Sequence, residues 1–164
     1  MKPRVLIAGV GNIFFGDDGF GVEVARRLET EALPPAARVV DFGIRGLHLA
    51  FELLEPLDLL VLVDTARRGG PPGTLYLIEP ADFDSRPADP DAHGMDIVQV
   101  FRMLEQLGGA RPKTRIVACE PADLGAGLAM SQAIQGAIAP AVKMVMDLVE
   151  EELNGNVGHN PVSS

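Results

Sequence analysis

Two adjacent aspartates after a glycine-rich turn are the first feature of this sequence that could do chemistry. The turn, Gly9–Asn12, follows a short apolar run, and Asp17 and Asp18 stand just ahead of a helical pattern. Carboxylates at a helix N-terminus repel an anion and compete with it for the backbone N–H groups, so this segment favours a cation. The alternative is that one of the two aspartates is only a helix N-cap, a common role for Asp at such a position.

The same segment lacks the spacing of the known nucleotide-binding loops. A G-x-G-x-x-G pattern that begins at Gly9 needs glycine where the chain has Phe14. A phosphate loop that begins at Gly11 needs lysine where the chain has Asp17. A nucleotide- or flavin-binding module of doubly wound type is therefore the less favoured alternative.

A further carboxylate, Asp64, ends the most apolar run of the chain, residues 57–63. Such a run predicts a central strand buried on both faces. Asp64 then lies at the carboxyl edge of the sheet, where open α/β sheets bind ligands. If this strand lies next to the first one, Asp18 and Asp64 are neighbours across the crevice at the switch point of the sheet, and we expect both in this solvent-accessible crevice rather than in the core. The alternative is an aspartate that bonds its own backbone at the start of a loop.

His93 is the histidine best placed to join these carboxylates. It begins a predicted helix, whereas His48 lies on the outer part of a short helix and His159 lies in a polar tail. A lone histidine is more often a surface residue than a ligand. Two carboxylates and an imidazole nevertheless suit a borderline divalent metal with open positions for a substrate. We therefore predict that Asp18, Asp64 and His93 are the catalytic residues and contact a metal.

Other catalytic patterns are missing from the sequence. It contains no H-E-x-x-H motif, and no serine lies in a G-x-S-x-G motif. The single cysteine, Cys119, lies in an apolar strand, where we expect a small buried side chain rather than a nucleophile.

Strands and helices alternate along the chain in the order that positions these residues. Apolar runs predict strands at residues 4–10, 38–42, 57–63, 74–78 and 114–119, and helical spacing predicts helices at 18–30, 46–55, 93–107 and 131–153. This order predicts a three-layer α/β/α domain around a mostly parallel sheet. The link 65–73 is too short for a crossover helix, so the strand at 74–78 should run antiparallel to its predecessor.

Composition limits the size and the partners of the protein. Its 164 residues suit one catalytic domain over residues 1–153, followed by a flexible tail at 154–164. The net charge of −9 argues against binding to nucleic acid. We found no signal peptide and no membrane span, and one cysteine agrees with a reducing compartment. We expect a cytoplasmic monomer with no membrane partner.

The glycines and aspartates together resemble a known family, the hydrogenase maturation endopeptidases (peptidase family M52). The matching motif is G-x-G-N-x-x-x-x-D-D-x-x-G, which runs from Gly9 to Gly21. Further matches extend over nearly the whole chain: the strand ending in Asp64, Pro72-Gly73-Thr74, His93 before a helix, Glu120-Pro121 and Gly127-Leu128. The family's metal-contacting residues map onto Asp18, Asp64 and His93.

The resemblance implies a fold and a reaction. The fold is a five-stranded mixed sheet with one antiparallel strand. The reaction is removal of a C-terminal extension from the precursor of a nickel–iron hydrogenase large subunit after nickel insertion. Nickel presented by the substrate would be what the three residues recognise, and another divalent metal could occupy the same site. A non-catalytic assembly chaperone is the alternative within this setting.

The chain departs from the family at one turn. Many members carry a Gly-Gly-Thr-like turn after the second strand, where this chain has Phe42–Gly46. Gly43 is expected to supply the flexible position of that turn.

Overall fold

A five-stranded sheet forms the centre of the molecule, in the order β2-β1-β3-β5-β4. The computed structural model describes residues 4–11, 16–81, 96–122 and 129–158. The strands are β1 (Val5–Val10), β2 (Ala37–Gly43), β3 (Leu59–Thr65), β4 (Leu75–Ile78) and β5 (Thr114–Cys119). The helices are η1 (Gly16–Gly19), α1 (Phe20–Glu29), α2 (Gly46–Glu52), α4 (Ile97–Gln106) and α5 (Gln132–Gly158).

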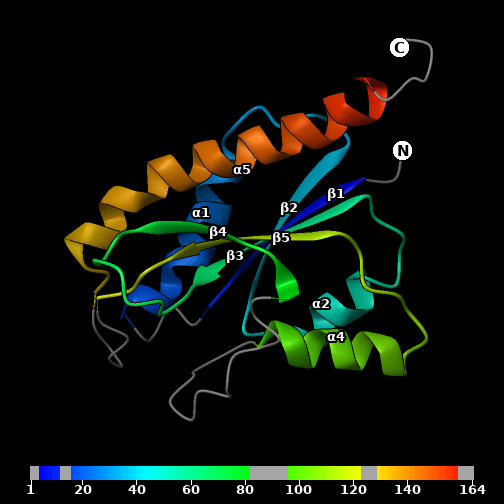
Figure 1. Cartoon of the computed structure of the whole chain (residues 1–164), viewed down its shortest axis with the longest axis horizontal. Helices are drawn as coiled ribbons and strands as arrows, with labels where there is room; N and C mark the ends of the chain where they lie inside the picture. The colour runs from blue at the N-terminus through cyan, green and yellow to red at the C-terminus, as the bar shows by residue number, and fades with distance from the viewer. Residues whose placement is uncertain (1–3, 12–15, 82–95, 123–128, 159–164) are drawn as a thin grey trace.

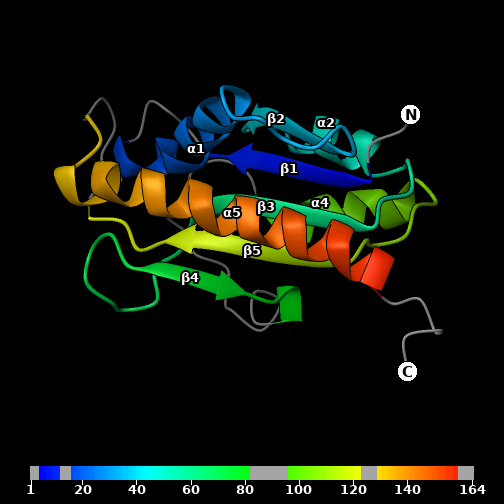
Figure 2. The same ribbon diagram turned by 90° about the horizontal axis from the view of Figure 1, so that it is seen from above.

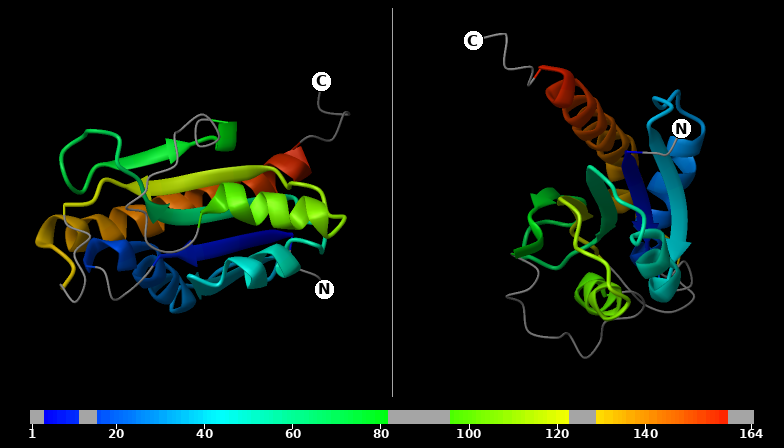
Figure 3. Two further views of the ribbon diagram at one scale, coloured as in Figure 1. Left: turned by 90° about the horizontal axis from the view of Figure 1, so that it is seen from below. Right: turned by 90° about the vertical axis from the view of Figure 1, so that its right-hand side faces the viewer.

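Helices cover both faces of the sheet, which confirms the three-layer α/β/α prediction. Helices α1 and α5 lie on one face, and α2 and α4 lie on the other (Figures 1 and 3). Viewed from above, the strands lie side by side in the order given by their pairing, and α5 crosses the middle of the sheet (Figure 2). Such layering lets each helix bury its apolar stripe against one face of the sheet.

Strand β3 is central because its side chains are apolar on both faces. Val61 and Val63 belong to the core cluster beneath α1 and α5. Leu60 and Leu62 belong to the cluster beneath α2 and α4. This alternation follows from the two-residue period of a strand, and it explains why the run reads as continuously apolar.

Strand β4 is the single antiparallel member of the sheet. It runs antiparallel to β5, and β5 is parallel to β3, so its predicted direction relative to β3 is confirmed. Its hydrogen-bonding partner is nevertheless β5, because β5 occupies the free edge of β3. The short link after β3 therefore carries the chain past β5 to the outer edge of the sheet.

Helices α1 and α4 begin at different residues from those predicted from the sequence. Helix α1 begins at Phe20 after η1, and its N-cap is Gly19 without a side-chain cap. The prediction that Asp17 or Asp18 caps this helix is therefore wrong. Helix α4 begins at Ile97 rather than at residue 93, because the Asp96 side chain accepts a hydrogen bond from the Val98 N–H and caps it.

The other two helices also end at different residues from those expected. Helix α2 ends at Glu52, and α5 continues past Leu153 to Gly158. The predicted apolar stripe of α5 is buried, as expected for a helix packed on a sheet: Ile134, Ile138, Val142, Val145 and Val149. Within the described ranges, no helix is long and apolar enough to cross a membrane.

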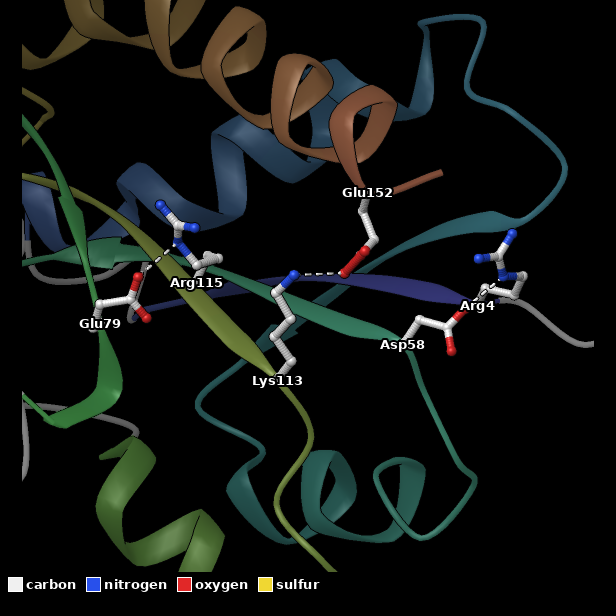
Figure 4. A network of polar contacts seen from close by, with 6 residues as sticks. All are labelled: Arg4, Asp58, Glu79, Lys113, Arg115 and Glu152. Atoms are coloured by element: carbon white, nitrogen blue, oxygen red, sulfur yellow. Dashed lines mark hydrogen bonds and ion pairs between the residues drawn. The ribbon is translucent and has the colours of Figure 1, made fainter. Parts of the chain in front are cut away.

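Ion pairs gather where the parallel strands begin (Figure 4). Arg4 pairs with Asp58, and Lys113 Nζ lies 3.0 Å from Glu152 Oε1 on α5. Arg115 Nε lies 3.2 Å from Glu79 Oε1, without the geometry of a hydrogen bond. Such exposed pairs contribute about 0 to 1 kcal/mol each. The opposite, carboxyl edge is where Asp18 and Asp64 lie.

Candidate active site at the carboxyl edge of the sheet

Asp18 follows β1 and Asp64 lies near the end of β3, and these two strands lie side by side. Strand β1 pairs in parallel with β2 on one side and β3 on the other, so the switch point of the topology lies between β1 and β3. Asp18 lies in η1, which follows β1, and Asp64 is the penultimate residue of β3. Thr65 joins them, because its hydroxyl lies 3.3 Å from Asp18 Oδ1 and its backbone N–H donates to Asp64 Oδ1 at 2.7 Å.

This arrangement confirms the predicted neighbourhood of the two carboxylates across the switch point. The bond between Asp64 and the Thr65 N–H also shows the local backbone contact expected of an aspartate at a strand end. Thr65 itself was missed by the sequence reasoning. The signal that could have found it is a hydroxyl directly after Asp64, at the same sheet edge.

The glycines of the motif allow η1 and α1 to approach the strands. A Cβ on Gly21 would lie 2.2 Å from the Val63 oxygen and 2.3 Å from the Val10 oxygen. A Cβ on Gly11 would lie 1.9 Å from the Asp18 carbonyl oxygen, and Gly11 has a φ of +136°. Side chains at these positions would push Asp18 away from Thr65. The glycines therefore set the position of the carboxylate.

Asp17 has a different role from its neighbour. Its side chain is fully buried and accepts hydrogen bonds from Ala122 N at 2.8 Å and Ser131 N at 2.7 Å, while the Ser131 hydroxyl lies 3.1 Å away. Ser131 directly precedes α5, where a negative charge is favoured by the helix dipole. Asp17 thus ties the end of β5 to the start of α5.

The burial of the two candidate ligands is unequal. Asp18 is 7% exposed, whereas Asp64 is half-buried. The sequence argument placed both in an open crevice, so it was wrong about the burial of Asp18. Asp18 is held between the motif glycines and Thr65, which makes its position well defined.

Glu120 holds the link between β3 and β4, residues 66–74, in place by hydrogen bonds. It is 5% exposed, and its Oε1 accepts bonds from Arg68 N at 2.8 Å, Gly70 N at 3.1 Å and Tyr76 Oη at 2.7 Å. Burial acts to raise the pKa of Glu120, but the hydrogen bonds from Arg68, Tyr76 and the glycines outweigh it, and the pKa is lowered. The bond to Glu120 raises the pKa of Tyr76 in turn.

We expect Glu120→Gln to reduce the loss of stability in acid. A carboxyl whose folded-state pKa is lowered stabilises the fold above its ordinary pKa, and that contribution is lost as the pH falls through the lowered pKa. The free energy of unfolding, measured with urea at several pH values, should fall less for the variant between about pH 5 and pH 3. At pH 7 the variant should be about 1 to 3 kcal/mol less stable. Glu151→Gln, an exposed carboxyl of α5, is the control. An identical pH profile for Glu120→Gln and wild type would contradict this role.

Cys119 is a core residue of the cluster beneath α1 and α5. It is fully buried, and burial, with the charges of Asp17 and Glu120, raises the pKa of its thiol to about 12. A thiol of this pKa is protonated at neutral pH and is a poor nucleophile. The prediction that Cys119 is a small buried side chain is confirmed.

His93 lies outside the described residues, so its place relative to the carboxylates stays a prediction. In the part of the chain that the structure describes, no group of three or more His, Cys, Asp and Glu side chains could hold a metal. The two described carboxylates fit a divalent metal in kind, since carboxylate oxygens are common ligands, but metal sites in proteins generally need a third ligand.

Sequence comparisons match this chain to hydrogenase maturation proteins. A family model described as hydrogenase maturation protease matches residues 22–148. The hydrogenase expression/formation protein HupD of Rhodobacter capsulatus is 35% identical over 154 residues, which cover 87% of this chain and 71% of HupD. The match extends over most of the chain, including β3, β5 and the helices around them.

Solved structures give the same result. The hydrogenase maturating endopeptidase HybD from E. coli superposes with a TM-score of 0.77 at 27% identity, covering 90% of this chain and 93% of HybD. The nickel–iron hydrogenase maturation protease HycI from Thermococcus kodakarensis superposes with a TM-score of 0.69 at 25% identity, covering 91% and 94%. The predicted five-stranded mixed sheet is therefore shared with these proteins.

Proposed function

The chain belongs to the hydrogenase maturation protease family, and from this premise we propose that it removes a C-terminal extension from the precursor of a nickel–iron hydrogenase large subunit. The family match over residues 22–148 is the observation that supports an endopeptidase activity. The contact between Asp18 and Thr65 at the switch point supports the location of the site, because this edge is where α/β sheets bind ligands.

Asp18 and Asp64 are the proposed protein contacts of the nickel that the precursor carries, with His93 as the third. Asp18 offers a buried carboxylate held in place by its neighbours, and Asp64 offers a half-exposed carboxylate that an incoming protein can reach. A divalent metal at this edge would act as a Lewis acid on the scissile carbonyl or on a bound water. The metal belongs to the substrate in this proposal, so the enzyme acts only after nickel insertion.

Thr65 is the proposed positioning residue of the pair. Its hydroxyl contacts Asp18, and its backbone N–H contacts Asp64, so one residue fixes both carboxylates. Asp17 and Glu120 act from further away, because they hold the segments around residues 122, 131 and 68–70 to the sheet edge. We further propose that the protein works as a monomer in the cytoplasm.

We expect the purified protein to cleave a precursor that carries nickel and to leave a nickel-free precursor intact. The physical reason is that the proposed site is acidic and built on glycines, so it offers carboxylates for a metal rather than a pocket for one side chain. The measurement is intact mass spectrometry of the large-subunit precursor, with and without nickel, after incubation with the protein. The expected product has lost a fixed C-terminal mass.

The controls for this experiment are a denatured precursor and an unrelated unstructured protein, neither of which should be cut. Efficient cleavage of the nickel-free precursor would show that metal recognition does not control the reaction. Tight binding of the nickel-loaded precursor without any cleavage would instead support the chaperone alternative.

A further inference from the structure

Exposed apolar side chains concentrate on one short segment of the surface. Of the large hydrophobic residues that are exposed in the described part of the chain, four lie between residues 44 and 54. They are Ile44, Leu47, Phe51 and Leu54, with exposed fractions of 54%, 54%, 51% and 41%. We call these four residues the α2 stripe. The remaining two are Leu77 on β4 and Leu107 after α4.

Two members of the stripe, Leu47 and Phe51, lie four residues apart on one side of α2 (Gly46–Glu52). Ile44 precedes the helix and Leu54 follows it, so the stripe extends just beyond both ends of α2. The opposite side of α2 is already buried, with Leu49 and Ala50 in the core. A solvent-facing helix side is ordinarily polar, as it is on α5, where Lys143 pairs with Asp147. Helix α2 therefore carries a second apolar face that the described fold does not use.

The stripe begins at the edge of the candidate active site. Ile44 directly follows Gly43, whose carbonyl accepts a hydrogen bond from Gly11 N at 2.9 Å. Gly11 packs against the backbone of Asp18, where an added Cβ would lie 1.9 Å from the carbonyl oxygen. From Ile44 the stripe runs along α2 toward the amino edge of the sheet, where Leu54 lies beside Gly109. The start of the stripe is thus linked to Asp18 through the backbone of Gly43 and Gly11.

The start of the stripe is held rigidly rather than left as a loose turn. Arg45 donates hydrogen bonds to the Phe42 oxygen, at 3.1 Å from Nε, and to the Asp41 oxygen. Its guanidinium also lies 5.9 Å from the centre of the Phe42 ring. A pre-organised apolar surface loses less conformational entropy when a partner binds.

The area of the stripe favours a larger partner over a second copy of this chain as the protein that covers it. Four half-exposed large side chains present roughly 300 to 400 Å² of apolar surface, which is too little for a stable dimer that needs about 600 Å² or more from each chain. The same area is sufficient as the apolar centre of an interface that also includes the active site. The proposed substrate is a folded protein that must lie on this edge to present its extension.

We propose that the α2 stripe is a docking surface for the hydrogenase large-subunit precursor, and that it receives an apolar segment of that protein beside the extension to be cleaved. This proposal rests on the proposed function. It gives the precursor a second contact, so that its recognition depends both on the metal and on an apolar surface beside it.

The test compares two charge substitutions on the surface. The variant Leu47→Glu/Phe51→Glu places two carboxylates in the middle of the stripe. The control Leu77→Glu places one on the exposed edge strand β4, at the far side of the sheet. All three side chains are exposed, so both proteins should melt near the wild-type temperature. Binding of the nickel-loaded precursor is titrated by calorimetry in an Asp64→Asn background, which prevents cleavage during the titration.

We expect the stripe variant to raise the dissociation constant by about ten- to a hundredfold, as for loss of a central apolar contact, and the control to change it by less than about twofold. In proteins with Asp64 intact, the stripe variant should raise KM by a similar factor and leave kcat within about twofold, because the chemistry at Asp18 and Asp64 is unaltered.

Unchanged affinity of the stripe variant would overturn the docking proposal. Sedimentation tests the other occupant. If the wild-type protein is a dimer, and the stripe variant is a monomer with unchanged affinity for the precursor, then a second copy of this chain covers the stripe and the docking proposal is overturned. Failure of the proposed function is distinct, because it appears as an uncut precursor with the wild-type protein, whatever the binding titration shows.

Discussion

Asp18→Asn and Asp64→Asn are each expected to abolish processing of the nickel-loaded precursor while the protein stays folded. We expect the rate to fall by about a thousandfold or more, as when a charged group that stabilises a transition state is removed. Asparagine keeps the shape of aspartate and one oxygen that can accept a hydrogen bond from the Thr65 hydroxyl, but it lacks the negative charge with which a carboxylate binds a divalent metal. His93→Ala is expected to give the same loss of activity.

The matched control is Asp58→Asn, at the start of β3. It removes the same charge directly before the same strand, at the opposite edge of the sheet, where Asp58 pairs with Arg4 (Figure 4). Since an exposed ion pair contributes about 0 to 1 kcal/mol, this variant should process the precursor at the wild-type rate. Processing assays and thermal melts are made on the same preparations. Normal processing by Asp64→Asn would remove Asp64 from the site.

Leu62→Ala is expected to have the largest effect on stability. Leu62 is 1% exposed in the middle of β3, and its neighbours in the sheet are Ala8 on β1 and Ile116 on β5. Truncation would leave a cavity between the sheet and helices α2 and α4, because the Leu62 side chain belongs to the core cluster beneath them. We expect the free energy of unfolding to fall by about 2 to 5 kcal/mol in a urea titration.

Leu77→Ala is the control for this truncation, because Leu77 is 44% exposed on the edge strand β4. It removes the same atoms but leaves no internal cavity, so its cost should stay below about 1 kcal/mol. A loss of stability for Leu62→Ala no greater than that of the control would show that β3 is not the rigid centre of the fold.

The two experiments together separate chemistry from structure. Leu62→Ala should lose activity only in proportion to the folded protein that is lost, whereas Asp64→Asn should lose activity at full stability. If Asp64→Asn destabilised the protein as much as Leu62→Ala, then Asp64 would be a structural residue. The site would then have to be rebuilt around Asp18 and His93, which are too few protein ligands for a metal site.

The sequence was sufficient to identify the strands and to locate two of the candidate residues. Apolar runs marked all five strands. The run is continuous in the central strands β1 and β3, because a strand that is buried on both faces is apolar throughout. Asp64 could be placed at the sheet edge for this reason. Asp18 could be placed there because a glycine turn after the first strand brings the next residues back over the same edge.

The different roles of Asp17 and Asp18 could not be predicted from the sequence, in which the two residues are adjacent. Asp17 bonds to residues 105 and 114 positions away, near the end of β5 and the start of α5. Asp18 instead faces Thr65 from the neighbouring strand. Successive residues of η1 point in different directions, and which direction meets which partner depends on how distant segments pack.

The sequence by itself determined the order and type of the elements, since hydrophobic periodicity is a local property that each segment carries alone. Only the tertiary structure decided which strand β4 pairs with, what Glu120 holds and which side of α2 stays exposed. Glu120 looks like an ordinary strand-end carboxylate until the fold brings Gly70, 50 residues earlier in the chain, within 3.1 Å of it. Similarly, Leu47 and Leu49 are equally apolar in the sequence, and only packing on the sheet buries one and leaves the other exposed.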